Sequence, residues 1–154
     1  MTSCTFEDIF NQFYIKAKAY DIASLNEAQS EELLCGWLHA AASKPYVRKL
    51  FSNFTIDDET HKVNFEMKYT IDDDTDLDFV LDIFGLGMIM EWYRPYINNY
   101  NNVAQVYGSK EERFFSQSSH FTGLQTIAKS VKKEQRQMIS DRGSAWNSYL
   151  DGEK

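Results

Sequence analysis

Apolar residues recur at every third or fourth position in the first third of the chain, and this spacing predicts two amphipathic helices. The first is expected over residues 5–20, with Thr5 and Asp8 as its N-terminal cap. The second should begin near Asn26 and end before Pro45, because the residue before a proline is pushed out of helical geometry. Each helix would bury one apolar face.

The pattern then changes to an alternation of apolar and polar residues, which predicts a small β-hairpin over residues 52–71. Val63 to Ile71 would form one strand, and Phe54 and Ile56 would lie in the other, across the turn sequence DDETHK. Because a lone two-stranded hairpin is only marginally stable in water, it should pack on the helices or on a neighbouring subunit.

A third helix is expected to begin with Thr75 and Asp78 as its cap and to end or kink near Pro95. Its middle is apolar on nearly all sides, which is typical of a helix surrounded by other elements. Gly85 and Gly87 lie in this stretch, and each costs roughly 1 kcal/mol against alanine inside a helix. We therefore expect close packing to require the two glycines.

A fourth and longest helix is expected from a capping box at Ser109 and Glu112 to a stop at Gly143. Apolar residues repeat along it at heptad intervals, which predicts a stripe that packs along another helix. The candidates for subunit packing in this stripe are Phe114, Phe121, Leu124 and Val131. The opposite face carries Lys129, Lys132, Lys133 and Arg136. This pattern predicts either a solvated face or contact with an acidic protein surface.

Together these elements predict a mainly α fold. It would comprise a four-helix bundle-like domain over residues 1–142, which includes the small hairpin, and an extended C-terminal arm over residues 143–154. The arm carries three large apolar side chains, Trp146, Tyr149 and Leu150, on an otherwise polar segment. Such a segment is expected to dock on the domain's own surface or on a partner.

The net charge of −7 on these 154 residues is unevenly distributed. Residues 1–93 hold 17 acidic and 7 basic side chains, whereas residues 94–154 hold 6 acidic and 9 basic ones. This balance argues against ordinary nucleic-acid binding, which needs clustered lysine and arginine. A chain with one acidic and one mildly basic part is suited to associate with copies of itself or with a partner through complementary fields.

Residues that could support catalysis or metal binding form no recognised motif. His39, His61 and His120 come from three different expected elements and lack metal-ligand spacing. The acidic run from Asp72 to Asp78 lacks the glycine and the glutamate of an EF-hand loop, so a helix N-terminus explains its carboxylates better. We therefore expect neither enzyme activity nor a cofactor or bound metal. A divalent-metal enzyme built on residues 72–82 stays open as an alternative.

The cysteines, the N-terminal residues and the longest apolar stretch bear on where the protein is found in the cell. Cys4 and Cys35 lack CxxC spacing, and the N-terminal residues show no basic segment followed by a long apolar one. We expect an origin in a reducing cytosol. The longest apolar stretch, residues 79–90, falls short of a bilayer-spanning helix, so we expect no membrane partner.

Two segments of the second half carry a resemblance to a known family. They are GMIMEWYRPYINN, at the end of the third expected helix, and FFSQSSHFTGLQTIAKSVKKEQRQMISD in the fourth, before a short aromatic tail. Their order is similar to that of the third and fourth helices of the head-to-tail connector, or neck adaptor, proteins of tailed bacteriophages. In the first half, TFEDIFNQFYIKAKAYDIASLNEAQSEELLCGWLHAA looks like that family's opening helix pair. The resemblance covers most of the chain outside residues 45–72.

The resemblance implies a virion protein that is made in the cytoplasm of the bacterial host. Its copies, commonly twelve, would form a ring beneath the portal protein and receive a tail-side neck protein, the stopper or tail terminator. Genomic DNA would pass through the ring without specific binding. The arm residues Trp146, Tyr149 and Leu150 then become portal-contact candidates.

An acidic channel would repel DNA phosphates and leave no strong binding site to stall their passage. The candidates for the channel lining are Asp57, Asp58, Glu59, Asp72, Asp73 and Asp74. The alternative function is a small cytoplasmic helical adaptor or regulator that binds one cellular protein through its aromatic surface, and this alternative predicts a monomer or dimer.

Overall fold

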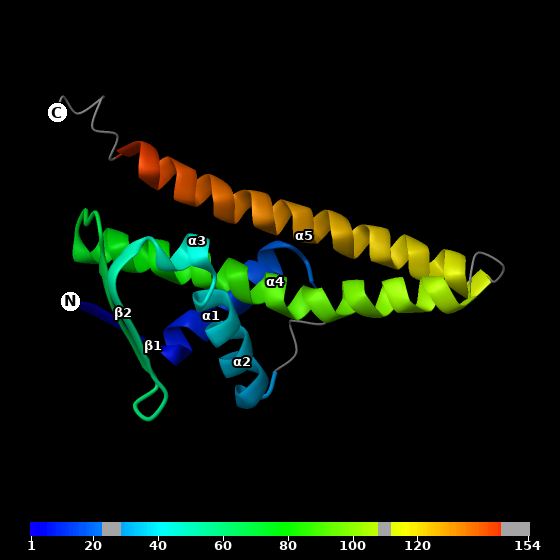
Figure 1. Ribbon diagram of the computed structural model, residues 1–154, viewed down its shortest axis with the longest axis horizontal. Helices are drawn as coiled ribbons and strands as arrows, with labels where there is room; N and C mark the ends of the chain where they lie inside the picture. Colours follow the sequence, from blue (N-terminus) through cyan, green and yellow to red (C-terminus); the bar gives the residue numbers. More distant parts are fainter. Residues whose placement is uncertain (23–28, 108–111, 146–154) are drawn as a thin grey trace.

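The computed structural model describes residues 1–22, 29–107 and 112–145, with the exception of the side chains of 97–122 and of Ala145. The described residues form five helices and three strands in the order β1, α1, α2, α3, β2, β3, α4, α5. Figure 1 shows a small body made by the first six elements and the start of α4, from which α4 and α5 extend side by side.

The first helix, α1 (Phe6–Ala19), is confirmed together with its cap. The hydroxyl of Thr5 accepts the backbone N–H of Asp8 at 3.1 Å, and the Asp8 carboxylate accepts the N–H of Thr5 at the same distance. This reciprocal capping box satisfies two donors that a helix end would otherwise leave unpaired. The apolar face of α1 is buried through Phe6, Ile9, Phe13 and Ala17.

The second helix, α2 (Glu31–Ala42), is capped by Ser30, whose side chain accepts the N–H of Leu33. The expected start near Asn26 lies outside the described residues. As predicted, the helix ends before Pro45. The proline instead opens a single turn, α3 (Pro45–Arg48), where its missing N–H leaves no helical hydrogen bond unmade.

The expected hairpin is confirmed as β2 (Phe51–Asp57) and β3 (Lys62–Met67), although β3 ends at Met67 and leaves Tyr69 and Ile71 exposed outside the strand. The hairpin belongs to a three-stranded antiparallel sheet. The third strand is β1 (Thr2–Thr5), which the sequence pattern did not predict. β3 is central, so that Phe65 lies opposite Thr2 on one side and Phe54 on the other. The additional strand and the helices behind the sheet give the hairpin the support it needs.

Two long helices, α4 (Asp73–Tyr107) and α5 (Glu112–Ala145), form an antiparallel pair. At about 1.5 Å per residue each is roughly 50 Å long. α4 begins earlier than expected, because the carboxylate of Asp72 rather than Thr75 caps it and accepts the Thr75 N–H at 2.7 Å. α5 continues past Gly143, where a stop was expected.

Pro95 was expected to end or kink the third helix, and it lies inside α4, so the helix does not end there. The register of the helix pair can be read from side-chain contacts, which bring Asp76 level with Arg142 and Ile83 level with Gln135. Extended along both helices, this register places Pro95 level with Gly123 of α5. Contacts between α4 and α5 along the pair offset what the proline costs, since tertiary packing routinely overrides helix propensity.

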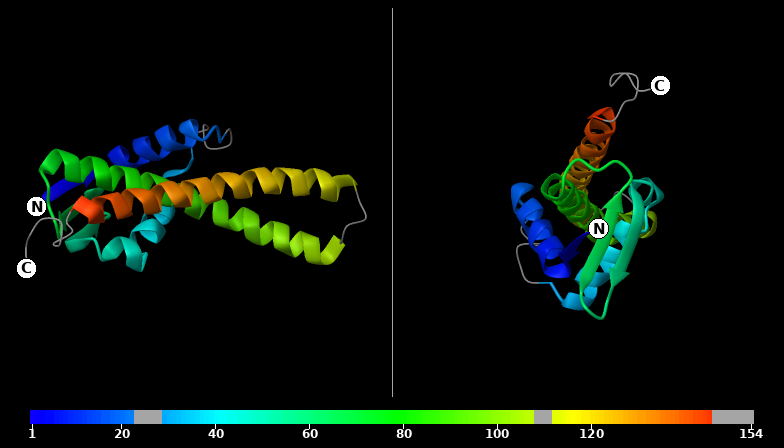
Figure 2. Two further views of the ribbon diagram at one scale, coloured as in Figure 1. Left: turned by 90° about the horizontal axis from the view of Figure 1, so that it is seen from above. Right: turned by 90° about the vertical axis from the view of Figure 1, so that its left-hand side faces the viewer.

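The expected four-helix bundle is wrong. In a bundle each helix packs on two neighbours, whereas here the described parts of α1, α2 and α5 each pack chiefly on α4 and meet one another through only a few side chains. The end-on view in Figure 2 shows α1 and the sheet flanking α4, with α5 on a third side. The fold is therefore a central helix with elements around it, and the sheet takes the place that a bundle would give to a helix.

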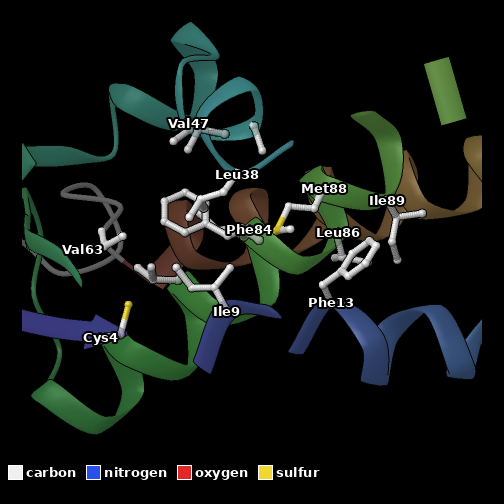
Figure 3. Packing of buried hydrophobic residues seen from close by; sticks show 14 of the residues in the cluster. Cys4, Ile9, Phe13, Leu38, Val47, Val63, Phe84, Leu86, Met88 and Ile89 are labelled. Atoms are coloured by element: carbon white, nitrogen blue, oxygen red, sulfur yellow. The ribbon is translucent and has the colours of Figure 1, made fainter. Parts of the chain in front are cut away.

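The core surrounds the middle of α4, which is buried on all sides as its composition predicted. In Figure 3, Leu38 and Val47 approach Phe84 and Met88 from one side, and Ile9 and Phe13 approach α4 from the other. The glycine pair is explained by this crowding. A Cβ at Gly85 would lie 3.3 Å from the backbone of α1, and one at Gly87 would lie 3.0 Å from the Cβ of Ala41 in α2.

Candidate interaction surfaces

A buried ion pair between Arg142 of α5 and Asp76 of α4 fixes the end of the helix pair at which α4 begins and α5 ends. Their side chains are 8% and 4% exposed, and the Arg142 Nη2 lies 2.5 Å from the Asp76 Oδ1. Arg142 Nη2 also donates to the carbonyl of Tyr69 at 2.8 Å, and the guanidinium lies over the Phe79 ring, with its Cζ 4.7 Å from the ring centroid. Asp76 in addition accepts the N–H of Ile71 at 3.2 Å. This cluster ties the end of α5 to the start of α4 and to the segment that follows β3.

A second buried polar contact lies about two helical turns further along the pair. Gln135 of α5 is 2% exposed, and its Nε2 donates to the carbonyl of Ile83 in α4 at 2.8 Å. The hydroxyl of Tyr46 donates to its Oε1 at 3.4 Å. A Cβ at Gly87 would lie 3.2 Å from the same Nε2, so the glycine provides the room for this amide.

Charged groups also join α1 to both long helices. The Lys16 ammonium lies 3.6 Å from Asp82 of α4 and 3.5 Å from Glu134 of α5. The hydroxyl of Tyr20 donates to the Glu134 carboxylate at 2.7 Å. The pKa of Tyr20 is raised by burial, and further by this hydrogen bond and the charge of Glu134. The network holds α1 against both long helices.

The heptad stripe of α5 packs inside the chain over its described part. Val131 is fully buried and Leu124 is partly buried against the core of their own subunit. The side chains of the other two packing candidates, Phe114 and Phe121, lie outside the described residues. At the described positions the predicted partner helix is therefore α4 of the same chain.

The channel-lining candidates fall into two separate groups. Asp57 ends β2, and Asp58 and Glu59 follow it in the turn to β3, whereas Asp72, Asp73 and Asp74 lie at the start of α4. The length of β3, at about 3.3 Å per residue, separates the two groups by roughly 20 Å. They do not form one continuous surface within a subunit.

Several of these carboxylates also have local partners. Asp57 accepts the N–H groups of Glu59 and Thr60, and hydrogen bonds from Thr60 are the main reason why the pKa of Asp57 is lowered. The pKa of Asp72 is lowered chiefly by its hydrogen bond to the Thr75 backbone. These two groups stabilise a turn and a helix end.

The β2–β3 turn is fastened to α2 by two histidine–carboxylate contacts that sequence reasoning missed. His39 Nε2 lies 2.7 Å from Asp58, and His61 Nδ1 lies 3.3 Å from Glu31. His61 has a positive φ of 54° and stacks on Phe6 with 5.2 Å between ring centroids. Positive φ is uncommon for a residue other than glycine, and here it sets the turn.

Groups that could hold a metal were not found in the described part of the chain, where no three His, Cys, Asp or Glu side chains converge. The side chain of His120 lies outside that part. Cys4 is buried, and burial together with the charge of Asp8 raises the pKa of its thiol to about 12. A thiol with so high a pKa is a poor nucleophile at neutral pH.

The basic side chains Lys129, Lys132, Lys133 and Arg136 of α5 are all exposed, as expected. They line an open surface depression of about 430 Å³ with Gln137 and Ser140. A second depression, of about 480 Å³, lies between the end of β3 and the last turns of α5, where Lys49 and Lys68 border the apolar side chains of Leu50, Met67 and Ile139.

The portal-contact candidates Trp146, Tyr149 and Leu150 lie outside the described residues. Within the described part of the chain, no helix has both the length and the apolar character that a membrane crossing requires. Comparison of the chain with protein-family models, with curated proteins and with solved structures found no match.

Proposed function

We propose that this protein is a head-to-tail connector of a tailed bacteriophage, which forms a ring of twelve copies beneath the portal protein and links the capsid to the tail-side neck protein. The observation that carries the proposal is the long antiparallel pair of α4 and α5, which projects from a small body. It coincides with the two segments of the sequence that resemble the third and fourth helices of that family.

The contacts within the pair support a structural role. The buried Arg142–Asp76 ion pair and the buried amide of Gln135 fix the register of two helices over about 10 Å of their length. Buried polar contacts of this kind specify one arrangement of helices more than they add stability. A body with a two-helix extension is suited to link two partners, one at the body and one at the tip.

The surface charges support the proposed channel. At least one of the two acidic groups, Asp57 to Glu59 or Asp72 to Asp74, would line the channel and repel DNA phosphates. Trp146, Tyr149 and Leu150 would contact the portal protein. The protein would act in the neck of the virion after synthesis in the host cytoplasm.

The test is the mass of the purified chain, measured by native mass spectrometry alone and with the portal protein encoded by the same genome. A complex of fixed stoichiometry is expected. Trp146→Ala/Tyr149→Ala should weaken it, whereas Ile15→Ala, which truncates a side chain that is 59% exposed on α1, should not. A chain that neither forms a ring nor binds the portal protein would refute the proposal and favour the cellular adaptor.

A further inference from the structure

The outward face of α5 carries a set of cations that form no ion pair with the described residues. This basic stripe consists of Lys129, Lys132, Lys133 and Arg136. Their spacing of three and four residues puts adjacent Cβ atoms about 5–6 Å apart. All four side chains are exposed, and none forms an ion pair with the described residues. Because like charges at this spacing destabilise a helix, the stripe lowers the stability of an isolated subunit.

The start of α4 carries the opposite charge, on carboxylates that likewise form no ion pair with the described residues, although Asp73 accepts a hydrogen bond from the Thr2 hydroxyl at 3.2 Å. This acidic patch consists of Asp73, Asp74 and Asp78, all of which are exposed. Asp74 and Asp78 are four residues apart and point away from the face that buries Asp76. Neither forms an ion pair with the described residues. The helix dipole favours carboxylates at this end, but it does not remove their mutual repulsion.

The chemistry of the stripe favours an acidic protein surface over nucleic acid. Polyanion binding by phosphate neutralisation needs many cations, and its affinity depends on a positive field around the site. Here four cations stand on a chain with a net charge of −7, and the acidic patch lies on the same pair of helices. A nucleic acid that extended beyond the stripe would meet the carboxylates of this chain and be repelled. A small acidic surface on a partner protein could bind the stripe without reaching them.

We infer that the basic stripe of one copy binds the acidic patch of the next copy. The contact joins two different surfaces and is therefore head-to-tail, which is the type of interface that generates rings when the rotation closes. The inference rests on the proposed function in that it assigns the subunit contact of the ring. It also leaves Asp57, Asp58 and Glu59 of the β2–β3 turn as the group that lines the channel.

The experiment uses two charge-reversed variants of the full chain, Lys132→Glu/Lys133→Glu and Asp74→Lys/Asp78→Lys. All four positions are exposed, so both variants should keep the circular dichroism spectrum of the wild type. Self-association, measured by native mass spectrometry and sedimentation, should weaken with added salt in the wild type. In each variant alone it should be about tenfold weaker or more, because like charges then face each other.

The decisive sample is an equimolar mixture of the two variants. In an alternating ring each reversed stripe meets a reversed patch, and each unchanged stripe meets an unchanged patch, so the mixture should regain the association that each variant has lost. The control combines Lys18→Glu on α1 with Glu66→Lys on β3, two exposed positions outside both surfaces. It should associate like the wild type.

The outcomes separate the inference from the proposed function. A wild-type chain that stays monomeric but binds the portal protein, or association that survives both reversals, would overturn the inference and leave the connector function standing. A mixture that fails to recover association would overturn it too. Recovery in the mixture would establish the contact, even in a chain that ignores the portal protein and so refutes the connector function.

Discussion

Replacing Arg142 by methionine should strongly destabilise the fold. The substitution leaves the Asp76 carboxylate, 4% exposed, without its cation, and it leaves the carbonyl of Tyr69 without its side-chain donor. Removing one partner of a buried ion pair costs about 3–5 kcal/mol, because the other charge stays buried. Methionine keeps an apolar stem over the ring of Phe79, so the loss reports on charge more than on packing.

The assay is urea unfolding followed by circular dichroism at pH 7. Domains of this kind have an unfolding free energy of about 5–15 kcal/mol, so the expected loss is a large fraction of the total. At an m value of about 2 kcal/mol/M, the unfolding midpoint should fall by about 1.5–2.5 M. Lys18→Met likewise replaces a cation by methionine, at an exposed position of α1 outside both proposed surfaces, and should stay within about 0.5 kcal/mol of the wild type.

A double variant makes the reasoning refutable. Asp76→Asn/Arg142→Met buries no charge, and the asparagine oxygen can still accept the N–H of Ile71. It should therefore be more stable than Arg142→Met alone. A loss below about 1 kcal/mol in the single variant, or a double variant less stable than the single one, would show that this ion pair does not hold the helices together.

Three further predictions concern packing, titration and transport. Gly87→Ala should destabilise the protein by about 1–3 kcal/mol in thermal unfolding, because the new methyl group would lie 3.0 Å from the Cβ of Ala41. The control Gly36→Ala, which has open space around it, should stabilise α2 by up to about 1 kcal/mol. With its pKa at about 12, the Cys4 thiol should resist iodoacetamide at pH 8 until the chain unfolds, while mass spectrometry finds Cys35 modified first. Since an unfolded thiol ionises near pH 8.5, the stability that the protonated Cys4 thiol contributes is complete below that pH and is lost as the pH rises toward 12. Glu59→Lys at the β2–β3 turn should slow DNA ejection from assembled virions, and unchanged ejection kinetics would exclude this residue from the channel lining.

Features set by neighbouring residues could be predicted from the sequence. The capping box of Thr5 and Asp8 involves residues three positions apart, and the hairpin turn joins strands that follow each other directly. The glycine pair was also predicted to serve close packing, since a helix that keeps two glycines gives up propensity at both positions. In each case the signal lies within one short stretch of the sequence.

Features that depend on distant residues could not be predicted. β1 is too short to show an alternation of its own, and it forms a strand because β3, about 60 residues away, supplies the hydrogen bonds. Pro95 ends an isolated helix, but packing within a helix pair overrides that preference. The bundle prediction failed for the same reason, because periodicity reveals that a helix has an apolar face but not which element covers it.

The candidate surfaces show the same division. The basic stripe was visible in the spacing of Lys129, Lys132, Lys133 and Arg136. In contrast, Asp76 and Arg142 look like surface residues in the sequence. They are 66 positions apart and meet only because α4 and α5 pack together. The histidine contacts of the β2–β3 turn likewise join residues of separate elements.

Pro95 and Gly123, which lie level with each other, have a mechanical consequence for the two-helix extension. A proline inside a helix removes one backbone hydrogen bond, and a glycine inside a helix lowers its resistance to bending. Because both weak points occur at one level, they act as a joint between the body and the tip. The contacts of Asp76 and Ile83 with α5 lie on the body side of this joint. We therefore expect the tip to change direction to suit its partner while the core remains undisturbed.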